Sequence, residues 1–249
     1  MDCMEMKQSG IRAPEPRLDW ALFLDIDGTL IEIAESPNAV KVPETLASTL
    51  VAAGQSLDGA LAIVSGRTLD VIDILMAPLK PPAAGEHGAV IRLPDGSVWN
   101  AASELAVPDE WKQRVCRAAE AWNGTVIEYK PYSIAAHFRQ APSYGPDVQR
   151  LFEAMVAENP NDFEVLRASM AFEVRHRDIN KGAAVRELMK HAPFSGRVPV
   201  FVGDDVTDED GFRVATELGG LGLHVGRSFG GKPSEVRRWL EAFRPNDAS

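Results

Sequence analysis

Short apolar runs alternate with amphipathic stretches in the first hundred residues and again near the end of the chain. Residues 20–24, 60–64 and 198–202 form apolar runs that stop at polar residues, a pattern typical of strands buried on both faces of a parallel sheet. Helical periodicity predicts helices over 43–53, 68–76, 181–190, 208–218 and 233–243, and residues 222–225 form another expected strand. Strands that alternate with helices indicate an α/β layer architecture.

The middle of the chain has a different order of elements. We expect helices over 108–122 and 146–158, each followed by two alternating strands, at 126–129 with 134–139 and at 163–167 with 170–175. A repeated α-β-β unit predicts a separate small domain with an antiparallel sheet. The predicted fold class is therefore α/β, with a Rossmann-like parallel-sheet core and an inserted α+β cap domain (α-β-β-α-β-β).

The same pattern sets the expected domain limits. Residues 1–18 contain Pro14 and Pro16 and little apolar periodicity, which favours a mobile N-terminal tail. The core is predicted to combine 19–103 with 177–249, and the inserted domain to cover 104–176.

Composition narrows the class of partner. The 249 residues are 45% hydrophobic and carry a net charge of −10, so a chain-wide basic surface for nucleic acid is absent. No stretch approaches the roughly 20 apolar residues that cross a bilayer, and the acidic N-terminus is unlike a secretory signal. Cys3 and Cys116 do not make a disulfide framework, so we expect a cytoplasmic protein. We expect a monomer that binds a small molecule and neither nucleic acid nor membrane.

Carboxylates follow two of the predicted strands directly. Asp25-Ile26-Asp27-Gly28-Thr29 follows the first strand, and Gly203 to Asp210 closes a later one. Ligands of open α/β sheets bind beyond the carboxyl ends of the strands. Neighbouring carboxylates repel unless a cation joins them, and hard oxygen ligands favour magnesium. The alternatives are a polar strand exit for the first stretch and a solvated helix start for the second, which is adequate for Glu209 and Asp210 but poor for Asp204.

Two further polar residues stand at the edges of predicted elements. Ser65 ends the second strand within Val64-Ser65-Gly66-Arg67, and Lys181 opens the helix after the inserted block. Taken alone, Ser65 is at least as well explained as a turn or N-cap residue, and a lone helix lysine is usually a solvated surface group.

Together, in this order and at these strand ends, the four stretches resemble the motifs of the haloacid dehalogenase superfamily of phosphatases. The resemblance implies that Asp25 is a nucleophile and that Asp27 is a general acid and base whose backbone carbonyl also binds the metal. It implies that Ser65 and Lys181 hold the phosphoryl oxygens. Asp204 would ligate Mg²⁺, with Asp205 or Asp208 assisting. An aspartyl-phosphate intermediate splits a difficult hydrolysis into two easier steps.

The position and order of the inserted block look like the type IIB cap of that superfamily, and within this group the chain resembles trehalose-6-phosphate phosphatases. The stretches that carry the resemblance are residues 24–30, 85–89, 128–130, 137–139, 172–175, 181–182 and 203–210. The resemblance implies sugar recognition by cap positions that match Glu128, Lys130, Arg139 and Glu173, with His137 a weaker match. Gly66, Arg67 and His87 complete the substrate-binding candidates.

Alternatives remain for the cap and for the substrate. The four charged cap residues also suit a cross-strand charge ladder on an exposed face, and His87 beside Gly88 also suits a structural turn. Ser169 stands where the family often has lysine, and His176 where it often has proline. A phosphatase for glucosylglycerol or mannosylglycerate phosphate, a phosphomutase and a non-catalytic sugar-phosphate sensor are the rival functions.

Overall fold

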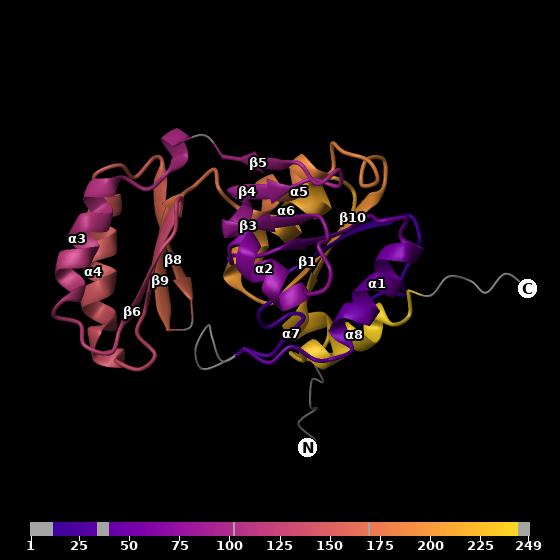
Figure 1. Cartoon of the computed structure of the whole chain (residues 1–249), viewed down its shortest axis with the longest axis horizontal. Helices are drawn as coiled ribbons and strands as arrows, with labels where there is room; N and C mark the ends of the chain where they lie inside the picture. Colours follow the sequence, from indigo (N-terminus) through magenta and orange to yellow (C-terminus); the bar gives the residue numbers. More distant parts are fainter. Residues whose placement is uncertain (1–11, 34–39, 102, 169, 244–249) are drawn as a thin grey trace, which may run out of the picture.

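Two β-sheets organise the chain, one largely parallel and one antiparallel (Figure 1). The computed structural model describes residues 12–33, 40–101, 103–168 and 170–243. The larger sheet belongs to the part of the chain predicted as the core, and the smaller one lies within the inserted block. The predicted fold class, a Rossmann-like core with an inserted α+β cap, is confirmed.

The core sheet has seven strands in the order β11-β10-β1-β2-β3-β4-β5. Strands β11, β10, β1, β2 and β3 are parallel, whereas β4 and β5 add antiparallel strands at one edge. The bounds are β1 Trp20–Leu24, β2 Leu61–Val64, β3 Ala83–Gly85, β4 Val90–Arg92, β5 Val98–Asn100, β10 Val198–Gly203 and β11 Leu221–His224.

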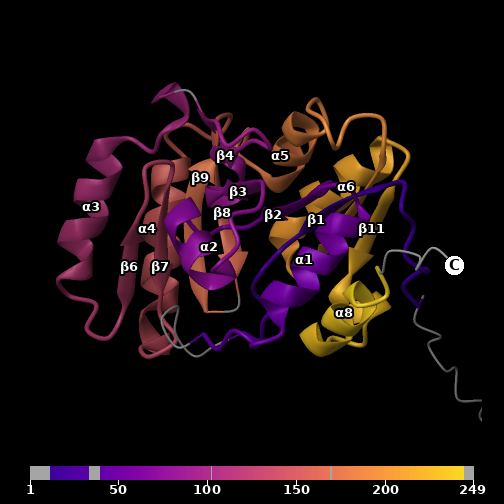
Figure 2. The ribbon, with the colours of Figure 1, turned by 45° about the vertical axis from the view of Figure 1, so that its right-hand side comes forward.

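Helices cover both faces of this sheet. Figures 1 and 2 show α1, α2 and α8 on one face and α5 and α6 on the other. The bounds are α1 Leu46–Ser56, α2 Leu69–Met76, α5 Lys181–Leu188, α6 Glu209–Glu217, α7 Val225–Ser228 and α8 Pro233–Leu240, with short 3₁₀ turns η1 Glu86–Gly88, η2 Ser103–Leu105 and η4 Val206–Asp208.

The central strands bring the predicted chemical residues to one edge. All five residues of β1 are buried, and Leu24 pairs with Val202 of β10 on one side and Ile63 of β2 on the other. Asp25, Ser65 and Asp204 follow these strands within two residues of the paired positions. Parallel strands end at a common edge, so the three side chains leave the sheet beside one another.

The inserted block forms a four-stranded antiparallel sheet in the order β6-β7-β9-β8. Its elements are α3 Asp109–Ala119, β6 Val126–Tyr129, β7 Ser133–His137, η3 Pro142–Tyr144, α4 Gly145–Val156, β8 Phe163–Ala168 and β9 Ala171–His176. Figure 1 shows α3 and α4 on the face of this sheet that points away from the core. Ile134, Ala136 and Val174 pack in the hydrophobic cluster of this block, so alternation turns Glu128, Ser133 and Glu173 toward the core.

Two separate hydrophobic clusters support a division into two domains. One is built from strands and helices of the predicted core, and the other from residues between Val107 and Val174. We propose 104–176 as the cap domain and 19–103 with 177–249 as the core. Residues 1–11 of the predicted mobile tail lie outside the described residues. Farther along, Ala13 packs against the core and Trp239 Nε1 donates to the carbonyl of Pro14 at 2.8 Å.

Strands β3, β4 and β5 and helix α7 were not expected from the sequence. Each strand has three residues, too few to show a period. Ala83, Ala84 and Gly85 also have low intrinsic strand preference, and β3 forms because it pairs with β2 and β4. Tertiary pairing, which local pattern does not contain, decides this edge of the sheet.

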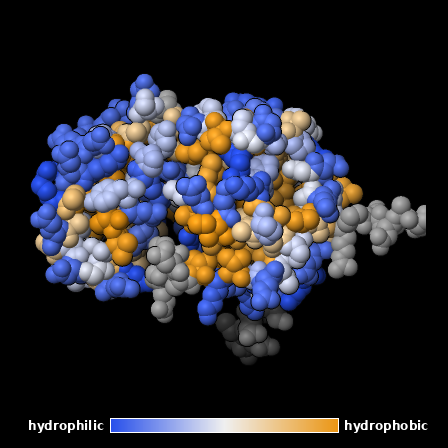
Figure 3. Space-filling model, in the orientation of Figure 1, coloured by the Kyte–Doolittle hydropathy of each residue, from blue (hydrophilic) through white to orange (hydrophobic). Residues whose placement is uncertain are grey.

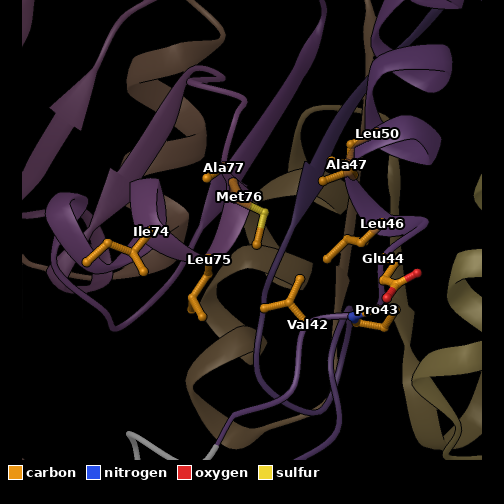
Figure 4. A pocket seen from close by; sticks show the side chains of 10 residues that line it. All are labelled: Val42, Pro43, Glu44, Leu46, Ala47, Leu50, Ile74, Leu75, Met76 and Ala77. Carbon is orange, nitrogen blue, oxygen red and sulfur yellow. The ribbon is translucent and has the colours of Figure 1, made fainter.

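An apolar pocket lies away from the strand ends, between α1 and α2. Figure 3 shows an apolar area near the middle of one face, where Figure 1 shows α2. The pocket holds about 240 Å³, and Figure 4 shows Val42, Leu46 and Met76 pointing toward one another across it. Among the described residues that line the pocket, Glu44 alone is charged, so the pocket offers little for chemistry. Within the described part of the chain, no helix is long and apolar enough to cross a membrane.

Candidate functional site

A buried lysine joins two carboxylates at the ends of the central strands. Lys181 Nζ donates to Asp25 Oδ1 at 2.7 Å and to Asp208 Oδ1 at 2.6 Å. Lys181 opens α5, whose N-cap Asn180 accepts from the backbone N–H of Ala183. That cap starts the helix where its first side chain meets the end of β1, so a residue far along the chain reaches Asp25.

Burial controls the ionisation of this cluster. Burial raises the pKa of Asp25 well above its usual range; Lys181 lowers it, while Asp208 and then Asp27 raise it further. Burial disfavours the Lys181 ammonium, but Asp208 and Asp25 together raise the pKa of Lys181 overall. We infer that the lysine is charged and that the surrounding carboxylates exceed it in number.

Asp204 lies beside this cluster, and its carboxylate is held by a hydrogen bond from Thr29 and by close packing against Gly28. Thr29 Oγ1 donates to Asp204 Oδ1 at 3.3 Å. Gly28 has φ +72°, and a Cβ there would lie 2.0 Å from Asp204 Oδ2. Burial, then Asp208 and Asp205, raise the pKa of Asp204 to about 7. A pocket of about 300 Å³ opens next to it, lined also by Glu32 and His224.

The carboxylates of Asp25, Asp204 and Asp208 form the group that suits a metal ion. One oxygen from each lies within 4.8 Å of the others, so one cation can touch all three. Two buried carboxylates and the half-buried Asp204 against one lysine leave an excess of negative charge, which a divalent cation would offset. The donor set of this cluster therefore suits a metal ion.

Asp205 and Asp208 differ in their surroundings, a distinction that the sequence left open. Asp205 is the N-cap of η4 and its side chain accepts from the N–H of Val206 at 2.5 Å. Asp208 is fully buried, and its Oδ2 accepts from the N–H groups of Asp204 at 2.9 Å and Asp205 at 3.0 Å. Asp208 thus orients the loop that carries Asp204, whereas Asp205 caps the turn and is outside the three-carboxylate group.

Asp27 makes a bidentate ion pair with Arg67. Arg67 Nε lies 2.6 Å from Asp27 Oδ2, and Nη2 lies 2.7 Å from Oδ1. Burial lowers the pKa of the Arg67 guanidinium, but the bond and charge of Asp27 raise it overall. Ser65, nearly completely buried, accepts the backbone N–H of Arg67 at 3.3 Å. The second strand end is therefore connected to the first.

Two cap residues reach the core directly. Lys130 Nζ donates to the carbonyl of Gly66 at 3.0 Å and to Glu173 Oε1 at 3.2 Å. Burial disfavours the Lys130 ammonium, but Glu173 and Glu128 raise its pKa overall. Burial alone would raise the pKa of Glu173, yet Lys130 and hydrogen bonds from neighbours lower it well below its usual range. Glu173 is therefore ionised at the boundary between cap and core.

His87 completes this boundary from the core side. Its Nε2 lies 3.2 Å from Glu173 Oε2, and burial lowers the pKa of His87 to about 4 against the raising effect of Glu173. The neutral ring must then donate its Nε2 proton to the ionised Glu173. His87 has φ +58° and Glu86 φ +49°, a conformation that side chains rarely adopt and that clusters at functional sites.

Of the remaining cap candidates, Glu128 and His137 lie farther out on the same sheet, and Arg139 lies beyond the end of β7. Glu128 Oε2 lies 3.8 Å from Lys130 Nζ and 3.4 Å from His137 Nε2. Arg139 is exposed in the turn after β7 and makes no hydrogen bond or ion pair with any residue in the described ranges, so the structure does not bring it to Glu173. Ser169 lies outside the described residues. His176 is buried with its ring edge on Phe163.

Ser133 belongs to this network and was missed in the sequence. Its Oγ donates to Glu173 Oε1 at 2.5 Å. Ser133 pairs across the sheet with Arg175, and the expected strand began one residue later. Extending the alternation of Ala135 and His137 by one step would have placed Ser133 on the face of Glu173.

Comparisons with known proteins find matches over most of the chain. Residues 23–240 match the trehalose-phosphatase family model. The chain is 43% identical over 208 residues to a probable trehalose-phosphate phosphatase of Sinorhizobium fredii, covering 84% of this chain and 78% of that protein. It is 34% identical over 235 residues to the trehalose-6-phosphate phosphatase of Escherichia coli, covering 92% and 88% respectively.

Solved structures share the fold at lower identity. The C-terminal domain of a C. albicans trehalose-6-phosphate phosphatase superposes with a TM-score of 0.73 at 21% identity, covering 90% of this chain and 92% of that one. A trehalose-6-phosphate phosphatase related protein gives 0.69 at 24% identity, covering 88% and 95%. These likenesses concern the architecture alone.

Proposed function

The chain belongs to the trehalose-phosphatase family, and from this premise we propose that it hydrolyses trehalose 6-phosphate to trehalose and inorganic phosphate. The observation that carries the proposal is Lys181 between Asp25 and Asp208, with the cap residues Lys130 and Glu173 above the adjoining loop. The core residues around Lys181 suit a phosphoryl group, and the two cap residues suit sugar hydroxyls.

Asp25 acts as the nucleophile in this proposal. A carboxylate oxygen of Asp25 bonds to phosphorus while the bond from phosphorus to the sugar oxygen breaks, and Asp27 gives its proton to that oxygen. Asp27 then takes a proton from water as the water oxygen attacks phosphorus. Phosphate leaves and the Asp25 carboxylate is restored. Lys181 holds Asp25 in one orientation and, with Ser65, offers hydrogen bonds to the phosphoryl oxygens.

The salt bridge from Arg67 has a consequence for Asp27. A bidentate guanidinium holds the carboxylate in one place and engages both of its oxygens. Asp27 must gain a proton before it can serve the leaving oxygen. A substrate phosphate that competes for Arg67 would loosen its pair with Asp27, and so would help Asp27 to take up this proton.

Asp25, Asp204 and Asp208 would hold Mg²⁺, with the backbone carbonyl of Asp27 as a fourth ligand and Asp205 assisting from the adjoining turn. The bound ion would supply positive charge to the phosphoryl oxygens. The support is the oxygen-only donor set and its excess negative charge.

Sugar recognition falls to the cap in this proposal. The core residues meet phosphate, which every sugar phosphate shares, so discrimination requires contacts beyond it. Glu173 accepts hydrogen bonds and Lys130 donates them; at the boundary with the core the Lys130 side chain is buried and the Glu173 side chain is 15% exposed. His87, Gly66 and Glu128 adjoin them, and His137 and Arg139 extend the same face outward.

The test is phosphate release over a panel of phosphorylated sugars with Mg²⁺. Trehalose 6-phosphate should be hydrolysed with far higher kcat/KM than glucose 6-phosphate, because a smaller sugar leaves cap groups unpaired at about 1–3 kcal/mol each. Preference for glucosylglycerol or mannosylglycerate phosphate would overturn the substrate assignment alone. Formation of an isomer without free phosphate would indicate a mutase, and binding without turnover a sensor.

A further inference from the structure

Arg175 is a buried cation that no step above uses. Its side chain is 1% exposed, at the end of β9 two residues beyond Glu173 and on the same face of the sheet. Its Nε and Nη2 donate to Glu164 Oε1 at 3.2 and 3.1 Å. Nη1 is buried without a hydrogen-bond partner among the described residues. Few groups therefore compensate the burial of this charge.

The second carboxylate near Arg175 belongs to the core. Arg175 Nη2 lies 3.7 Å from Asp210 Oδ2. Asp210 is in the first turn of α6, directly after the loop that carries Asp204 and Asp208. Glu164 is a neighbour within the cap sheet, so Asp210 is the partner that joins Arg175 to the other domain.

The first turn of α6 also touches the phosphate-binding lysine's helix. A Cβ on Gly182 would lie 2.5 Å from the carbonyl oxygen of Asp210, so only glycine permits this approach. Gly182 follows Lys181, and the position of Asp210 is thereby tied to that of Lys181. Asp210 therefore adjoins Arg175, on the same strand as Glu173, on one side and the helix that begins at Lys181 on the other.

We propose that Arg175 is a positioning residue that, through Asp210, fixes the sugar-facing Glu173 at a set distance from the phosphate-facing Lys181 and Asp25. The inference rests on the proposed function, since it concerns a substrate that is held at both ends. A sugar phosphate has a fixed separation between its phosphorus and its far hydroxyls, so the site needs a fixed separation too. A short phosphate ester never reaches Glu173 and does not depend on it.

The contact also depends on cap position. If the cap moved away from the core, Arg175 would keep its pair with Glu164 within the cap, and Asp210 would keep its pair with Arg213 at 3.1 Å within the core. The pair between Arg175 and Asp210 is the part that is lost. Arg175 and Asp210 therefore favour the closed cap, in which Glu173 also meets His87 and Lys130.

The decisive variants are Asp210→Asn and, as the matched control, Glu164→Gln. Each removes one carboxylate from Arg175, but only the first carboxylate lies in the core. Asp210→Asn should lower kcat/KM on trehalose 6-phosphate at least tenfold and on p-nitrophenyl phosphate less than threefold, mostly through KM if closure is coupled to sugar binding. Glu164→Gln should change both substrates equally and by less than threefold. Arg175→Lys, which keeps the charge, should recover part of the loss seen for Arg175→Met.

A double-mutant cycle and a measurement without substrate separate the outcomes. Arg175→Met with Asp210→Asn together should be no worse than Arg175→Met alone. Small-angle scattering should show a larger radius of gyration for Asp210→Asn than for Glu164→Gln. Additive losses, equal losses on the two esters, or equal radii would overturn the inference. If the parent prefers a different sugar phosphate, the proposed substrate fails, and the same comparison made with that sugar phosphate still tests Arg175.

Discussion

Replacing Lys181 with methionine tests how much the Lys181 ammonium stabilises the folded protein by pairing with the carboxylates of the site. Lys181 is 2% exposed and its ammonium is shared by Asp25 and Asp208. Methionine keeps much of the volume and removes the charge, so two buried carboxylates lose their common partner. Breaking one side of a buried ion pair costs about 3–5 kcal/mol, and we expect the free energy of unfolding at pH 7.5 to fall by about that amount.

The loss should depend on pH in a defined direction. Burial raises the pKa of Asp25 and Asp204 in the folded protein, that of Asp204 from 3.8 to about 7. Between pH 3.8 and about 7 the folded state therefore binds more protons than the unfolded state. The two carboxyl groups thus make the free energy of unfolding fall as the pH rises through this range. Lys181 lowers the pKa of Asp25 in the parent, and its removal steepens the fall. The variant should be closer to the parent at pH 5 than at pH 7.5.

The measurement is the free energy of unfolding in urea, for the parent and Lys181→Met at pH 5 and pH 7.5, each with and without Mg²⁺. Lys190→Met is the matched control, because Lys190 lies just beyond the end of α5, is 66% exposed and, among the described residues, pairs with Glu187 alone; its change should stay within about 0.5 kcal/mol. Added Mg²⁺ should recover more stability in Lys181→Met than in the parent. A loss equal to that of Lys190→Met, or one that is the same at both pH values, refutes the charge argument.

Four further outcomes follow from the site. Asp25→Asn, nearly isosteric, should keep its unfolding midpoint within a few degrees and lose phosphate release by at least a thousandfold; substantial turnover by the purified variant would remove Asp25 from the nucleophile role. Chelation should stop activity and Mg²⁺ restore it, whereas Ca²⁺ should restore it poorly because it prefers more ligands at longer distances; full activity after exhaustive chelation would contradict the metal proposal. Glu173→Ala should lower kcat/KM on trehalose 6-phosphate by about 2–4 kcal/mol and on p-nitrophenyl phosphate only slightly; equal losses would assign Glu173 to the fold. Gly28→Ala should weaken Mg²⁺ affinity in calorimetry, because its Cβ would lie 2.0 Å from Asp204 Oδ2; unchanged affinity would show that Asp204 does not bind the ion.

The buried strands were predictable because their chemistry is local. Residues 20–24 and 198–202 are apolar and carry no competing period, and β1 and β10 occupy those positions with β10 one residue longer. Strands β3 and β5 lack such a local basis: β3 is built from Ala and Gly, and all three residues of β5 are exposed. Their existence depends on pairing partners elsewhere in the chain.

The site residues that directly follow buried strands could be predicted from the sequence, because the ends of those strands could be predicted. Asp25, Ser65 and Asp204 each follow a buried strand, so their convergence follows from the topology of a parallel sheet. Lys181 gave no such indication by itself, because its approach to Asp25 depends on where α5 begins. The sequence also could not separate Asp205 from Asp208, since the difference is a matter of burial and of which backbone N–H groups each carboxylate accepts.

The charge pattern of the site explains how an acidic chain can bind an anionic substrate, and why a cation is needed. Lys181, Arg67 and Lys130 face the site, and each already pairs with a carboxylate at 3.2 Å or less: Asp25 and Asp208, Asp27, and Glu173. A phosphate group that binds one of these cations must therefore weaken the existing ion pair between that cation and its carboxylate. A divalent ion held by Asp25, Asp204 and Asp208 would compete for the carboxylates that pair with Lys181, and would leave its ammonium freer to meet the phosphoryl oxygens. Metal and substrate affinities should therefore rise together, each strengthening the other by the same factor.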